Sequence, residues 1–131
     1  MHAIIILKIM EGFMGLLLTL LGILTVVFFM LASVNGLKKY IKAPIIKKIA
    51  KQHRLFGMLA TGTALIHMLV AVIDGNLRIT GTLALIALIT TGMMGMMFQN
   101  QKSKAFYIAH RIMGPVTLVL IIIHIIFNAT T

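Results

Sequence analysis

Four long apolar runs alternate with short polar segments along the chain, and each run is long enough to cross a membrane as a helix. A helix needs about 20 apolar residues to cross the ~30 Å hydrocarbon core of a bilayer. The predicted spans cover residues 13–34, 55–73, 79–98 and 105–128, with a longer loop over 35–52. The pattern predicts an all-α protein: one domain over residues 1–131 that forms a membrane-spanning, up-and-down four-helix bundle.

The first ten residues are also apolar, although they contain His2 and Lys8. Together with the first span they exceed what one perpendicular crossing requires. We expect them to form a tilted extension of the first helix or a segment lying in the membrane interface. A cleaved signal peptide is an alternative interpretation, because Lys8 precedes an apolar run that ends in small residues.

The amino-acid composition also indicates a membrane protein. Of the 131 residues, 60% are hydrophobic and only 11% are charged, which lies outside the usual range of soluble domains. Cysteine is absent, so disulfides, iron–sulfur clusters and thiol chemistry are excluded.

The net charge of +10 reflects topology and does not indicate nucleic-acid binding, because the basic residues gather in two of the three loops. Those in or beside the first and third loops are Lys38, Lys39, Lys42, Lys47, Lys48, Lys51, Arg54, Lys102, Lys104 and Arg111. Only Lys8 and Arg78 fall on the other side. The positive-inside rule then predicts cytoplasmic first and third loops and both termini outside. We expect an integral protein of a bacterial or archaeal plasma membrane, with anionic lipid headgroups as partners of the lysines.

A histidine motif occurs twice, once in the second span and once in the fourth. Both copies read His-Arg-x-x-Gly-x9-His. The motif residues are His53, Arg54, Gly57 and His67 in the first copy, and His110, Arg111, Gly114 and His124 in the second. Fourteen residues fall about 40° short of four helical turns, so the two imidazoles of each copy share a face, about 21 Å apart along the axis.

The second and fourth spans run parallel in an up-and-down bundle. His53 is then level with His110, and His67 is level with His124. Two imidazoles from facing helices at one level are the arrangement for bis-histidine ligation of a haem iron, so the two levels predict two b-type haems, inner and outer.

Two other motif positions fit the same interpretation. Gly57 and Gly114 lie one turn from the inner histidines, where a side chain would collide with a porphyrin ring. Arg54 and Arg111 follow the inner histidines directly. They are candidates to bind the inner haem propionates, although snorkelling into lipid headgroups is an equal alternative.

Non-haem metal sites and ion transport fit the four histidines less well. Zinc or copper sites usually add cysteine or carboxylate ligands, and transport of protons or ions usually requires acidic residues at membrane depth. The only acids are Glu11 and Asp74, both near the outer surface. Hydrogen-bonded packing histidines remain an alternative.

The duplicated motif resembles that of membrane dihaem b cytochromes, most closely the cytochrome b561-like and ferric-reductase-like transmembrane group. The resemblance covers about Phe13 to Asn128 and implies ligation by His53 with His110 and by His67 with His124. It also implies electron transfer across the membrane, often with a quinone at one end. No flavin or nicotinamide domain accompanies the spans, so electrons are expected from a quinol, a small reductant or a separate subunit.

The sequence thus predicts a dihaem b cytochrome that carries electrons between a quinone pool and a partner redox subunit or small acceptor. It would act as a subunit of a larger membrane oxidoreductase or as a stand-alone quinone-linked oxidoreductase, and no side chain is assigned a catalytic role. The alternative is a small non-haem membrane transporter or a structural membrane subunit. Loss of one haem on replacement of an outer histidine would separate the two hypotheses.

Overall fold

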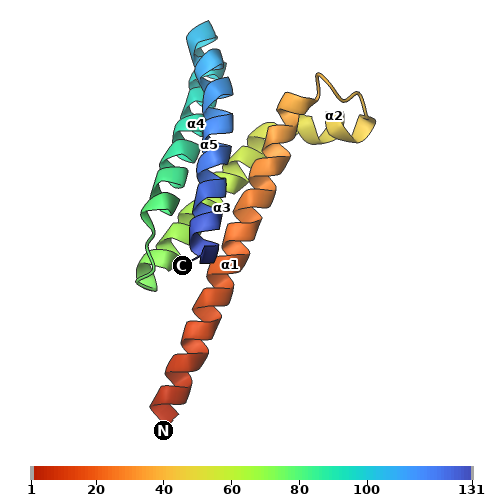
Figure 1. Ribbon diagram of the computed structural model, residues 1–131. Coiled ribbons are helices and arrows are strands. Elements are labelled where there is room, and N and C mark those ends of the chain that lie inside the picture. The colour runs from red at the N-terminus through yellow and green to blue at the C-terminus, as the bar shows by residue number, and fades with distance from the viewer. Residues whose placement is uncertain (1, 131) are drawn as a thin grey trace.

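The computed structural model describes residues 2–130, which form helices and short connections without a strand (Figure 1). The helices are α1 (His2–Leu37), α2 (Pro44–Lys51), α3 (His53–Ile73), α4 (Ile79–Gln101) and α5 (Lys104–Thr130). Within this range α1, α3, α4 and α5 are long and apolar enough to cross a membrane. The chain runs up α1, down α3, up α4 and down α5, so the expected all-α up-and-down bundle is confirmed.

Helix α1 is much longer than the other three. Its 36 residues extend about 54 Å at a rise of ~1.5 Å per residue, against ~30 Å of hydrocarbon. Residues 2–10 continue the helix of the first span without a break, so they form the helical extension that was one of the interpretations of this segment. This N-terminal part projects beyond the rest of the bundle in Figure 1, and side chains from Ile4 to Phe13 are exposed.

The basic loop between the first two spans contains the short helix α2. Pro44 occupies its first turn, where the missing N–H of proline removes no helical hydrogen bond. Ala50 is buried where α2 packs against α1 and α3, while Lys47 and Lys48 are exposed. This basic segment lies beside the ends of α1 and α3 that are opposite to the two termini (Figure 1).

The four long helices pack as two pairs, α1 against α3 and α4 against α5, and α3 also contacts α4. Each pair contains a hydrogen bond between threonine hydroxyls. Thr25 of α1 donates to Thr63 of α3 at 3.0 Å, and Thr91 of α4 lies 2.8 Å from Thr117 of α5. Helices α3 and α5 carry the histidines, and their backbones do not pack closely on each other. Residues of both pairs line a common cavity between them.

A small apolar core closes this space at mid-depth. It consists of Phe29, Ala60, Ala84, Leu88 and Ile121. Ala60 is fully buried and lies seven residues from each histidine of α3. The core therefore separates the level of the inner histidines from that of the outer ones.

Candidate functional site

The four histidines of the repeated motif meet in two pairs between α3 and α5. The ring centroids of His53 and His110 are 5.7 Å apart, with ring planes at 80°. Those of His67 and His124 are 6.3 Å apart, with planes at 79°. The structure therefore places His53 beside His110 and His67 beside His124, as expected from the sequence.

Each histidine ring is held by the adjacent helix through its Nδ1 atom. His53 bonds the Ala32 carbonyl at 2.8 Å, and His67 bonds the Leu18 carbonyl at 3.0 Å. His110 bonds the carbonyl of Thr91 at 2.8 Å. A carbonyl oxygen only accepts, so Nδ1 of these three rings donates and carries the proton. In the neutral imidazole this leaves the lone pair on Nε2, which is the metal-binding tautomer.

The fourth ring is held by a side chain. The Thr80 hydroxyl lies 3.1 Å from Nδ1 of His124. A hydroxyl accepts as well as donates, so this contact is compatible with the same tautomer. Within residues 2–130, no hydrogen bond to Nε2 of any of the four rings is found. Each pair thus presents two Nε2 atoms that have no protein partner.

The neighbouring helices repeat the spacing of the histidines. The accepting carbonyls of Leu18 and Ala32 are fourteen residues apart on α1, as His53 and His67 are on α3. Since the two helices are antiparallel, equal spacing places both carbonyls beside their rings. The bonds at both levels therefore depend on one common helical register.

Glycines on α4 lie against the rings of α5. A Cβ at Gly81 would come within 2.9 Å of Cε1 of His124, and one at Gly95 within 3.1 Å of the His110 ring. These glycines are also fourteen residues apart. Any larger residue would displace the ring, so their lack of a side chain lets α5 approach α4 closely.

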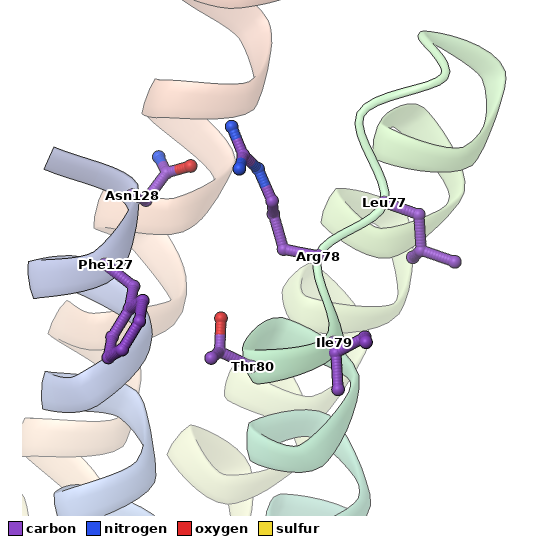
Figure 2. A pocket seen from close by; sticks show the side chains of 6 residues that line it. All are labelled: Leu77, Arg78, Ile79, Thr80, Phe127 and Asn128. Atoms are coloured by element: carbon purple, nitrogen blue, oxygen red, sulfur yellow. The ribbon is translucent and has the colours of Figure 1, made fainter. Parts of the chain in front are cut away.

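A cavity of ≈ 680 Å³ opens beside the outer histidine pair. It is lined by residues of all four long helices, among them His67, His124 and Gly22. Its volume lies within the range of about 300–1,000 Å³ in which proteins bind small molecules and cofactors. A smaller cavity of ≈ 260 Å³ continues at its outer end (Figure 2). The residues that line this smaller cavity are Leu77, Arg78, Ile79, Thr80, Phe127 and Asn128.

The remaining motif residues lie around the inner pair. A Cβ at Gly57 or Gly114 would have no neighbour within 4 Å, so both glycines border open space. Arg54 is exposed, and so is Arg111, whose guanidinium donates to the Tyr107 hydroxyl at 3.2 Å and lies 5.5 Å from that ring. The propionate-binding role expected of both arginines stays a prediction.

A metal between either pair has only two protein ligands. Within the described part of the chain, no three His, Cys, Asp or Glu side chains lie together as a metal site. A site built from protein side chains alone usually needs three or four ligands. The pairs can therefore bind a metal whose other ligands come from a bound molecule.

Sequence reasoning missed the residues that hold the rings. The carbonyls on α1 and α4 are main-chain atoms, which no residue type reveals. Gly81 and Gly95 carry a signal in their fourteen-residue spacing, which matches that of the histidines opposite.

Comparison of the chain with models of protein families, with curated proteins and with solved structures finds no match. The structure itself defines the class, an integral membrane protein made of an all-α bundle. Two pairs of histidines face each other inside that bundle.

Proposed function

We propose that the chain is a dihaem b-type cytochrome that carries electrons across the membrane. His53 and His110 would bind the iron of the inner haem, and His67 and His124 that of the outer haem. The observation that carries the proposal is that four rings, anchored at Nδ1, face each other in two pairs at nearly the separation that one iron requires.

The separation can be calculated from bond lengths. A metal–imidazole bond is about 2 Å long. The centroid of the ring lies about 1.1 Å from its nitrogen, as follows from ring bonds of ~1.33 Å. Two rings on opposite sides of one iron then have centroids about 6.2 Å apart, which the outer pair matches at 6.3 Å. The rings of the inner pair, at 5.7 Å, would have to move apart by about 0.5 Å to hold an iron. Rotation of each ring about its own iron–nitrogen bond makes the near-perpendicular planes compatible with this geometry.

The surroundings also suit a porphyrin. The macrocycle supplies four nitrogen ligands of its own, so two imidazoles complete six-coordination without a third protein ligand. The ≈ 680 Å³ cavity beside the outer pair offers space for a bulky planar ligand. Gly22 and Ala64 line it, and Gly57 and Gly114 border open space at the inner level.

When bound, a haem supplies one-electron redox chemistry. The residues of the chain hold and insulate it. The Nδ1 hydrogen bonds fix each ring and raise its basicity as a ligand. The two levels are about 21 Å apart along the helix axes, and core residues such as Phe29 and Leu88 exclude water between them.

The partners and orientation belong to the same proposal. The lysines in and beside α2 favour a cytoplasmic position for that end of the bundle, with both termini outside. A quinone pool at one end and a redox subunit or small acceptor at the other would make the chain an electron-transfer subunit or a stand-alone quinone-linked oxidoreductase. The likeness of the histidine motif to the cytochrome b561-like and ferric-reductase-like group supports this role. A non-haem transporter or structural subunit is the competing hypothesis.

Haem content tests the proposal directly. Protein purified from haem-replete cells is expected to show a Soret band, a low-spin b-type reduced-minus-oxidised spectrum and two haems per chain by pyridine haemochrome. His67→Ala and His124→Ala should each retain one haem. Leu69→Ala is the matched control, because Leu69 lies on α3 near His67 but is 61% exposed. The proposal is wrong if haem is absent, or if His67→Ala keeps two low-spin haems.

A further inference from the structure

Arg78 stands at the outer end of the cavity that contains the outer histidines. We infer that Arg78, together with Asn128, binds the carboxylates of the outer haem, so that the propionate edge of the macrocycle faces the outer surface. This inference rests on the proposed function. It assigns a ligand contact to a residue outside the repeated motif.

Among residues 2–130, Arg78 has no carboxylate counterion. Within residues 2–130 no carboxylate forms an ion pair with its guanidinium, and Asp74, four residues earlier, accepts a hydrogen bond from Asn76 at 3.2 Å. In the described part of the chain, the hydrogen bonds of Arg78 involve only its backbone carbonyl, which accepts from the N–H and the hydroxyl of Thr82. An arginine has five donors in a planar fork that matches a carboxylate, and here these donors remain available.

The position of Arg78 links it to the outer histidines. The residue lines both the larger cavity, with His67 and His124, and the smaller cavity that continues from it. Figure 2 shows its side chain extending from the start of α4 toward Asn128 of α5, with Thr80 nearby. Thr80 is also the residue that bonds His124. The stretch from Arg78 to Thr80 therefore contains both this guanidinium and the hydroxyl that bonds the ring of His124, an iron-ligand candidate.

Two further groups add donors at the same place. The Asn128 side chain lines both cavities and carries an amide NH₂. Arg78 is also the N-terminal boundary residue of α4, and no side chain caps this end of the helix. The first N–H groups of a helix lack intrahelical acceptors and favour a negative charge. A carboxylate at the cavity mouth would thus meet a guanidinium, an amide and a helix N-terminus.

Removing the guanidinium should weaken outer haem binding. Hydrogen bonds to charged groups are among the stronger ones in proteins, and their loss corresponds here to a rise of about tenfold to a hundredfold in the haem dissociation constant. Loss of a positive charge beside the iron should also shift the midpoint potential of the outer haem to a more negative value. The inner haem, at the other level, should be unaffected.

The test compares haem with its dimethyl ester, in which both carboxylates are neutral. Full-length protein carrying His53→Ala isolates the outer site, and each compound is titrated into the haem-free form by Soret absorbance. The expected result is tighter binding of haem than of the ester, a preference that Arg78→Gln abolishes. Lys8→Gln is the matched control, since it removes the only other basic residue predicted on that side.

The outcomes separate the inference from the proposed function. If haem binds but Arg78→Gln leaves both affinities unchanged, or if the unsubstituted site binds the ester as tightly as haem, the inference is wrong. Arg78 would then face the phosphates of lipid headgroups. If no variant binds haem, the proposed function fails, and the inference fails with it.

Discussion

Replacement of Gly81 by alanine places a methyl group against the His124 ring. The new Cβ would lie 2.9 Å from Cε1 and 3.3 Å from both ring nitrogens, while ordinary contacts begin at 3.4 Å. The ring must therefore move by about 0.5 Å, if the backbone of α4 stays in place. This movement strains the 3.1 Å contact with Thr80, which precedes Gly81 on the same helix.

The shift is large on the scale of metal coordination. Ligand distances in metal sites hold to within about 0.2 Å, so a displacement of about 0.5 Å cannot be absorbed by the iron–nitrogen bond alone. Overpacking costs about 1–3 kcal/mol, and loss of the Thr80 hydrogen bond adds about 1 kcal/mol. Since ~1.4 kcal/mol is a factor of ten in affinity, the outer haem should bind at least about tenfold more weakly.

The assay is a Soret titration of haem-free protein with haem, together with a haem count on protein as purified. Gly92→Ala is the control, because it makes the same change on α4 where a Cβ meets nothing within 4 Å. We expect Gly81→Ala to lose the outer haem selectively and Gly92→Ala to keep both. Two haems bound with unchanged affinity in Gly81→Ala would show that the His124 ring is not held where iron ligation needs it.

Three further predictions concern hydrogen bonds and topology. Thr80→Val removes the partner of His124 Nδ1 and should weaken outer haem binding about twofold to tenfold, measured by the same titration; unchanged affinity would mean that the hydroxyl does not orient the ring. Thr117→Val deletes a fully buried hydroxyl bonded to Thr91 and should lower the unfolding free energy in detergent by about 0.6 kcal/mol, with two haems retained; loss of haem would contradict a purely structural role. Because the chain has no cysteine, Lys47→Cys offers one thiol, which should react with an impermeant maleimide in inverted vesicles but not in intact cells; the reverse result would invert the proposed orientation.

Features that depend on local sequence were predictable. The spans follow from runs of apolar residues, and the pairing of His53 with His110 follows from fourteen-residue spacing on parallel helices. Both depend only on helical geometry and an up-and-down order. The structure brings these two rings to 5.7 Å, while the iron between them remains a prediction.

Features that depend on packing between helices were not predictable. The backbone carbonyls of Leu18 and Ala32 accept hydrogen bonds from the histidines of α3. A leucine or an alanine in an apolar run does not indicate such a role, because every residue has a carbonyl. Arg78 lies outside the repeated motif, in which arginines follow histidines directly. The role inferred for it depends on a cavity lined by residues of both α4 and α5.

The sequence pattern left the start of α1 open between several alternatives. Lys8 and Glu11 lie between Ile4 and the first span, but apolar residues flank both, so hydropathy alone does not mark where the membrane crossing begins. The structure continues the helix from His2. A long apolar run shows that a helix can cross a membrane, but it does not show which of its residues lie within the bilayer.

Anchoring through main-chain carbonyls makes these hydrogen bonds insensitive to side-chain identity at the accepting positions of α1 but sensitive to changes in its length. Most apolar residues at positions 18 and 32 offer the same oxygen. One residue inserted between them turns the far end of the helix by about 100° and advances it by ~1.5 Å, which withdraws one oxygen from its imidazole. A deep mutational scan that includes indels should therefore find that position 18 tolerates exchange between apolar residues, while the interval from 18 to 32 tolerates neither insertion nor deletion.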